Sequence, residues 1–166
     1  MLDAIVTWLH VLAAVVFIGP QVFLVAVAMP ALRSIDDVRA RQAASRRITR
    51  GFGVLGGIAL AVLLATGIWN FFEADDDGLM EFERYFFVMQ AKLTLVTVVI
   101  VLVALHAAVF GRRLQALQDR GAPEEELAVA RRWSVLASSL TLLVSLAILL
   151  LAALLDSDWS RMGGIR

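Results

Sequence analysis

The chain has 166 residues, of which 60% are hydrophobic and 18% are charged, and 15 basic residues balance 15 acidic ones. A soluble domain carries nearer a quarter charged residues, and a protein of this size could not hide so much apolar surface from water. The balanced charge argues against nucleic acid as a partner, and the absence of cysteine excludes disulfides, thiolate metal sites and thiol nucleophiles.

The first apolar stretch covers about residues 4–31 and is long enough to cross a bilayer. The chain starts Met-Leu-Asp without a basic residue, and this apolar run is longer than the core of a signal peptide. We therefore expect a retained span, and Gly19-Pro20 predicts a bend within it.

Three further apolar stretches follow at about residues 51–72, 85–111 and 133–155. Each reaches the ~20 residues that a helix needs to cross ~30 Å of hydrocarbon. The connections between them are short, which favours antiparallel neighbours. The sequence thus predicts an all-α fold with a single domain over residues 1–166: an integral membrane, up-down four-helix bundle.

Charge in the connections predicts the orientation of the spans. The first and third connections are rich in arginine: Arg33, Arg39, Arg41, Arg46, Arg47, Arg50, Arg112, Arg113, Arg120, Arg131 and Arg132. The second connection is acidic, with Glu73, Asp75, Asp76, Asp77, Glu81 and Glu83. The positive-inside rule then places the arginine-rich connections in the cytoplasm and both termini outside. We expect a multi-pass protein of the cytoplasmic membrane, with the lipid bilayer as its surroundings.

Three basic side chains fall inside these spans. Lys92 is the only lysine of the chain, and His10 and His106 are the only histidines. Ionisable groups in hydrocarbon cost a few kcal/mol, so each one raises a functional hypothesis. At 1.5 Å per residue, His10 and Lys92 lie at similar depth near the outer side, whereas His106 lies near the cytoplasmic side. One iron held between the two histidines is therefore not expected.

Helical periodicity places polar residues on one face of three spans. The stripes are His10, Phe17, Gln21 and Ala28 in the first span, Lys92, Val99 and His106 in the third, and Ser134, Ser138, Thr141 and Ser145 in the fourth. Polar groups in a bilayer are best satisfied inside a bundle. The sequence therefore predicts a polar seam, a common place for a haem or metal site.

Structural interpretations of the same residues stay open. The Lys92 ammonium could extend to the outer interface. His106 could be an interfacial histidine on the cytoplasmic side that bonds a carbonyl or a serine. Gln21 could bond a backbone carbonyl released by Pro20, and the serines and threonine could serve helix packing. Close packing is also what the G-x-x-x-G pair of Gly53 and Gly57 predicts.

Two segments resemble known membrane proteins. The run Trp8-Leu9-His10-Val11-Leu12-Ala13-Ala14 to Ile18-Gly19 resembles the L-H-x-x-A-x-x-x-W-x-G start of copper-resistance-D (CopD) domains and of HemJ-type protoporphyrinogen oxidases. The run Ala91-Lys92-Leu93-Thr94-Leu95-Val96, through His106 to Gly111-Arg112-Arg113-Leu114, resembles the A-K-L-x-L-V…H…G-R-x-L segment of the HemJ type. The chain departs from these patterns at Phe17, at Pro20 and in the later place of His106.

The HemJ resemblance implies a four-helix membrane bundle with a b-type haem, whose histidine and lysine match His10 and Lys92. We accordingly expect a haem b-binding membrane protein for redox or electron transfer, with His10 on the iron and Lys92 as second ligand or propionate partner. His106 is the candidate metal ligand of a second site, and Gln21, on the stripe of His10, completes the predicted cofactor-binding set.

Three other functions stay open. A HemJ-like protoporphyrinogen oxidase would pass electrons to quinone or to a redox partner protein. A CopD-like copper transporter would use His10 with Met89 and Met80, because imidazole and thioether suit Cu(I). An accessory subunit would use the seam for helix packing alone. The sequence leaves open whether the chain is an enzyme and whether it forms a homo-oligomer.

Overall fold

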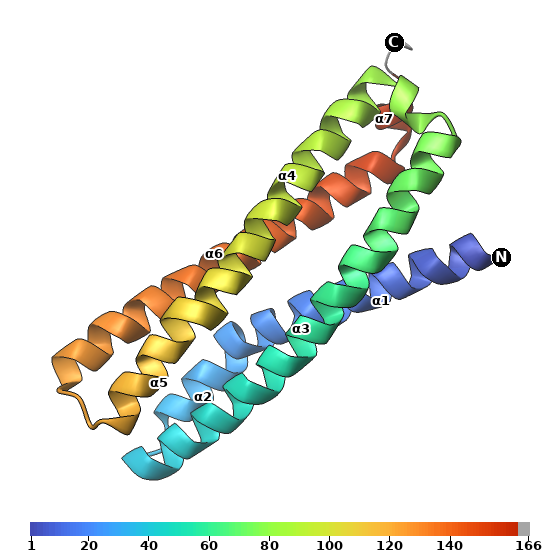
Figure 1. Cartoon of the computed structure of the whole chain (residues 1–166). Coiled ribbons are helices and arrows are strands. Elements are labelled where there is room, and N and C mark those ends of the chain that lie inside the picture. The colour runs from blue at the N-terminus through green and yellow to red at the C-terminus, as the bar shows by residue number, and fades with distance from the viewer. Residues whose placement is uncertain (163–166) are drawn as a thin grey trace. The chain divides into compact units, whose positions relative to one another are not determined.

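The computed structural model describes residues 1–162, and these form helices and short connections without a strand (Figure 1). The elements are α1 (Leu2–Phe23), the π-helical η1 (Leu24–Ala28), α2 (Met29–Arg33), α3 (Val38–Asp76), the 3-10 turn η2 (Leu79–Glu81), α4 (Glu83–Leu105), the π-helical η3 (His106–Gly111), α5 (Arg112–Asp119), α6 (Glu124–Asp156) and α7 (Asp158–Arg161).

Four continuous helical stretches are long and apolar enough to cross a membrane. They are Leu2–Arg33, Val38–Asp76, Glu83–Asp119 and Glu124–Asp156. Each contains one of the four expected spans. Along them many large apolar side chains face outward, as hydrocarbon surroundings favour and water would not. The all-α, four-span prediction is confirmed, and the chain is a multi-pass membrane protein.

The chain divides into two compact units, with the first from Met1 to Gly78 and the second from Leu79 onward. In the first unit, α1 and α3 pack as an antiparallel pair around Ala13, Phe17 and Ala59, which are all buried. The rings of Phe23 and Phe52, 6.2 Å apart, mark the end of this pairing near the connection between the helices.

In the second unit, α4 packs against α6, and its buried face carries Tyr85, Met89 and Val99. Two contacts at opposite ends show that the pair is antiparallel. The Arg84 guanidinium lies 5.1 Å from the centre of the Trp159 ring, and at the far end Leu117 packs with Leu127 in a buried apolar cluster.

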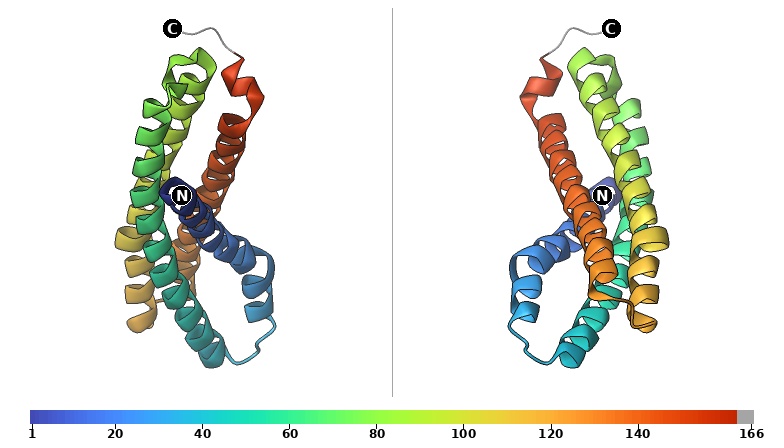
Figure 2. Two further views of the ribbon diagram at one scale, coloured as in Figure 1. Left: turned by 90° about the vertical axis from the view of Figure 1, so that its right-hand side faces the viewer. Right: turned by 90° about the vertical axis from the view of Figure 1, so that its left-hand side faces the viewer.

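The first span stays helical through Pro20, although proline cannot donate a backbone hydrogen bond to the carbonyl four residues earlier. The irregular segment is η1, one turn later, where the chain widens to π-helix. The helical path changes direction between α1 and α2 (Figure 2). The predicted bend is therefore present in this region, but the departure from α-helical bonding lies at Leu24–Ala28 and not at Gly19-Pro20.

Capping and turn residues mark where helices begin and end. The Asp37 carboxylate caps α3 by accepting hydrogen bonds from the backbone N–H groups of Arg39, at 2.8 Å, and Ala40, at 3.3 Å. Gly78 follows α3 at φ 71° and Gly121 follows α5 at φ 64°. Glycine adopts this left-handed backbone without steric penalty, so both helices end there.

Candidate functional site

His10 lies on the face of α1 that packs against α3, and its side chain is half-buried. Its ring nitrogen Nδ1 is 2.8 Å from the hydroxyl oxygen Oγ1 of Thr66, which is buried on α3. The predicted inward orientation of His10 is therefore observed within the first unit. The contact joins two helices through polar atoms inside an interface that is otherwise largely apolar.

The hydroxyl of Thr66 decides which ring nitrogen carries the proton. Its oxygen lies 2.7 Å from the carbonyl oxygen of Val62, and two oxygens approach so closely only with a proton between them. A carbonyl cannot donate, so Thr66 donates its one hydroxyl proton to Val62. Thr66 then accepts from His10, which places the proton on Nδ1 and the lone pair on Nε2. Nε2 is thus the nitrogen able to ligate a metal.

Gly67 makes room for the imidazole. A Cβ at this position would lie 3.2 Å from Cε1 of His10 and 3.8 Å from Nδ1. The first distance is shorter than ordinary van der Waals contact, so a side chain here would push on the ring. At Gly53 and Gly57, in contrast, no described atom beyond the adjoining residues and backbone of α3 lies within 4 Å of the Cβ position. The glycine of close approach in α3 is Gly67, and the close packing predicted for the G-x-x-x-G pair is not observed in this unit.

Gln21 has a local partner. Its side-chain Nε2 donates to the carbonyl of Phe17 at 3.0 Å, one turn back in the same helix. The carbonyl that Pro20 leaves without an N–H donor is that of Val16, four residues before it, so Gln21 does not bond the released group. The half-buried amide is satisfied within α1, and its predicted role in cofactor binding stays a prediction.

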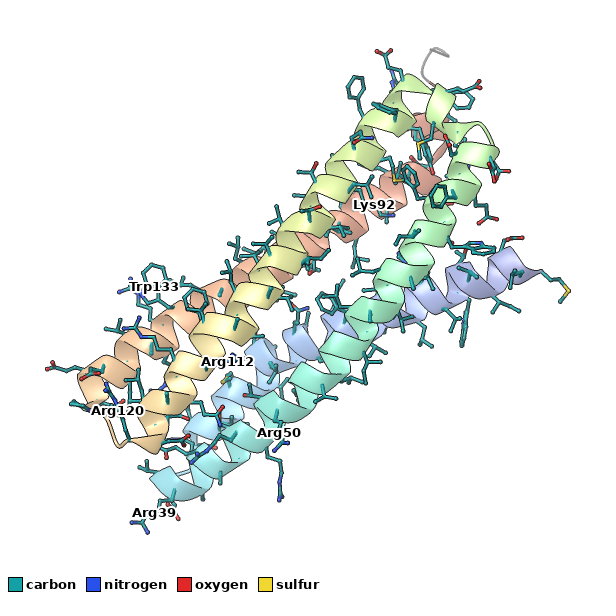
Figure 3. All side chains as sticks on the ribbon, in the orientation of Figure 1. Arg39, Arg50, Lys92, Arg112, Arg120 and Trp133 are labelled. Atoms are coloured by element: carbon teal, nitrogen blue, oxygen red, sulfur yellow. The ribbon has the colours of Figure 1, made fainter. Side chains whose placement is uncertain are left out.

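Lys92 lies on the buried stripe of α4, between Met89 and Val99, and its side chain is half-buried (Figure 3). The ammonium makes no hydrogen bond or ion pair with any residue in 1–162. A lysine inside a span without a partner is costly, which keeps a functional role plausible on physical grounds.

His106 begins the π-helical segment η3. Its Nδ1 is buried and has no hydrogen-bond partner among the described residues. A Cβ at Gly111 would lie 3.1 Å from the His106 carbonyl oxygen, so the widened turn closes tightly at this glycine. Nδ1 therefore makes neither of the hydrogen bonds that a purely structural role would use, to a backbone carbonyl or to a serine. π-Helical turns occur frequently at functional sites, which makes His106 a ligand candidate on local geometry.

The stripe in the fourth span divides into two groups. Thr141 and Ser145 are buried, and their hydroxyls donate to the carbonyls of Ala137 and Thr141 in their own helix, at 2.9 and 2.8 Å. Ser134 is half-buried, and Ser138 is exposed. The buried pair is satisfied within α6 and serves the close packing of α6 on α4.

The residue that sequence reasoning missed is Thr66. A signal was present, because Thr66 lies about as far from the C-terminal end of the second expected span as His10 lies from the N-terminal end of the first. Two polar residues at one depth in neighbouring antiparallel helices favour a contact.

Among the described residues, no group of three or more His, Cys, Asp or Glu side chains is placed to hold a metal ion.

The fold and these residues define an α-helical, multi-pass membrane protein with an oriented imidazole between two of its spans. The family model of copper resistance protein D (CopD) matches residues 46–155, more than half of the chain. The chain belongs to the CopD family. The matched region includes Thr66, Lys92 and His106 and begins after His10. Comparison with curated proteins and with solved structures gave no significant match.

Proposed function

We propose that the protein transfers copper across the membrane, with the His10 imidazole as a ligand to Cu(I). The supporting observation is the hydrogen bond between His10 Nδ1 and Thr66, which holds the ring between the two helices. With the proton on Nδ1, as the bond from Thr66 to Val62 indicates, Nε2 is the nitrogen suited to a metal. Metal-binding histidines generally donate their second N–H to an oxygen in this way. Membership of the CopD family supports copper as the metal.

Copper(I) prefers soft and borderline ligands such as thioether and imidazole. The sequence-based candidates for further ligands are Met89 and Met80, in the second unit. Met89 is buried on α4, and Met80 is half-buried in η2. Their part in copper transfer stays a prediction, as do ligand roles for His106 and Lys92.

Haem b is the competing cofactor. An imidazole held by a hydrogen bond also suits haem iron, so the geometry at His10 fits both groups. The CopD match favours copper and adds no support for haem, electron transfer, quinone or protoporphyrinogen oxidation. These uses stay predictions from the sequence, with Lys92 as second ligand or propionate partner in the haem case.

Metal analysis and visible spectroscopy of one sample separate the two cofactors. We expect detergent-purified protein grown with added copper to bind Cu(I) and to lack a Soret band after haem supplementation. Copper binding should fall strongly in His10→Ala, because the proposed ligand is removed. The opposite result would favour haem as the cofactor: no copper binding by the wild type, together with a Soret band that is lost in His10→Ala.

Transport needs its own measurement. Proteoliposomes loaded with a Cu(I)-responsive dye should report copper entry with the wild-type protein and little entry with His10→Ala. Thr141→Val is a suitable control, since Thr141 is also buried in a span but bonds its own helix and no histidine. Equal entry with wild type and His10→Ala would contradict a role of His10 in copper transfer.

The proposed orientation keeps the arginine-rich connections in the cytoplasm and both termini outside. It rests on the positive-inside rule and on the acidic connection between α3 and α4. With this orientation His10 lies near the outer surface, where an incoming ion would first enter the spans.

A further inference from the structure

The helix α3 is much longer than a bilayer is thick. Its 39 residues correspond to about 58 Å at 1.5 Å per residue, against ~30 Å of hydrocarbon. Its charge-free run begins at Gly51, so the turns before this residue carry the arginines out of the hydrocarbon. Arg47 and Arg50 occupy the last turn before the apolar run begins.

Arg47 and Arg50 are exposed and make no ion pair with any residue in 1–162. Two arginines of the second unit, in contrast, have carboxylate partners. Arg120 forms an ion pair with Glu126, and Arg131 lies 3.6 Å from the carboxylate of Glu124. The first unit therefore presents cationic charge that its own side chains leave uncompensated.

An apolar surface lies at the same level of the first unit. The contact between Phe23 and Phe52 sets the height of the two antiparallel helices, so the residues after Phe23 lie level with those before Phe52. There Val25 and Val27 of η1 are 52% and 51% exposed. Water would disfavour these valines, and hydrocarbon would disfavour the arginines. Both are satisfied at the boundary between headgroups and acyl chains.

We propose that Arg47 and Arg50, with the exposed valines at their level, bind an anionic phospholipid. The guanidinium groups would hold the headgroup phosphate through paired N–H donors, and the acyl chains would cover the valines. Residues three apart on a helix lie on adjacent turns, so both arginines can reach one phosphate. We name this the Arg47–Arg50 surface. It is independent of copper transfer and needs neither His10 nor a cofactor.

Arg39 provides an internal comparison on the same helix. It lies eleven residues before Arg50, which is about 17 Å along the axis and nearly the same face. Figure 3 shows both side chains extending away from the α3 ribbon. The headgroup layer is only about 5 to 8 Å deep on each side, so Arg39 should lie beyond it. Lipid binding should therefore depend on Arg50 and not on Arg39.

The test is native mass spectrometry of the full chain in detergent, titrated with phosphatidylglycerol or phosphatidylcholine. We expect the wild type to bind phosphatidylglycerol in preference. Arg47→Gln/Arg50→Gln should weaken this binding roughly 25-fold, on the basis of about fivefold for each arginine. Arg47→Lys/Arg50→Lys should retain a large part of it, because the charge remains.

Three outcomes would overturn the proposal. One is unchanged binding in Arg47→Gln/Arg50→Gln. Another is an equal loss of lipid binding in a control variant. The controls are Arg120→Gln/Arg131→Gln, which removes the same charge from paired arginines, and Arg39→Gln. The third is complete displacement of the lipid by millimolar inorganic phosphate, which would show a simple anion site without a contribution from the acyl chains. Unfolding temperatures of all variants in detergent identify any loss that comes from misfolding.

Discussion

The imidazole of His10 donates a hydrogen bond to Thr66 across the interface of two antiparallel helices, over 2.8 Å between Nδ1 and Oγ1. The two residues are 56 positions apart in the chain. Around them the interface is built from apolar side chains such as Ala13, Phe17 and Ala59. The bond therefore ties α1 to α3 at this level, and it also holds the imidazole in one orientation.

Replacement of Thr66 by valine should weaken copper binding. The β-branched shape is kept, but the acceptor for His10 Nδ1–H is lost, so the ring is free to rotate or change tautomer. Loss of such a supporting bond typically costs 10- to 100-fold in metal affinity. Competition with a chromophoric Cu(I) chelator measures the change. Thr141→Val should leave the affinity unchanged, although both variants should lose a similar, small amount of stability, about 0.6 kcal/mol.

Alanine at position 67 should disturb the same ring sterically. The new methyl group would meet His10 Cε1 at 3.2 Å, and the ring would have to move by a few tenths of an ångström. We expect a lower unfolding temperature and weaker copper binding, with a cost of about 1–3 kcal/mol. Gly57→Ala is the matched control, because no described atom beyond the adjoining residues and backbone of α3 lies within 4 Å of its Cβ position.

A double-mutant cycle can assign this effect to His10. In a His10→Ala background the obstructing ring is absent, so Gly67→Ala should then cost little stability. An equal cost in both backgrounds would mean that the methyl group perturbs something other than the imidazole.

Alanine at position 111 should destabilise the π-helical turn. Its methyl group would lie 3.1 Å from the carbonyl oxygen of His106, and a backbone atom cannot move aside as a flexible side chain can. We expect a loss of about 1–3 kcal/mol, measured as a lower unfolding temperature in detergent. Gly53→Ala, with open space around its Cβ position, should change the temperature little. Unchanged stability in Gly111→Ala would show that η3 rearranges without cost.

Labelling of single cysteines tests the proposed orientation. The chain has no cysteine of its own, so each introduced thiol is the only reactive one. In intact cells, Asp76→Cys should react with a membrane-impermeant maleimide, because the connection between α3 and α4 lies outside in the proposal. Ser34→Cys, in the connection between α2 and α3, should react only after the membrane is broken. The reverse labelling pattern would show that the protein has the opposite orientation in the membrane.

Much of the architecture was accessible from the sequence. Each apolar run predicted a span because hydrocarbon requires about 20 apolar residues and tolerates few charges, and these constraints are local. Helical periodicity likewise placed His10 with Phe17, and Lys92 with Val99, on inward stripes, and both stripes contain buried residues. The close packing predicted for Gly53 and Gly57 is not observed within the first unit, because a small-residue spacing says which face can approach another helix, not whether one does.

The sequence by itself determined that the chain spans a membrane in four helices and carries three basic side chains within them, because composition and period are properties of single segments. The partners of those side chains were decided by tertiary structure. Thr66 meets His10 only through the antiparallel register of α1 and α3, and Gly67 is the close-approach glycine for the same reason. Lys92 lies half-buried on the inward stripe of α4 without a hydrogen bond or ion pair among residues 1–162, an outcome that its own segment does not reveal. Such registers depend on many apolar contacts between distant segments, which no single segment encodes.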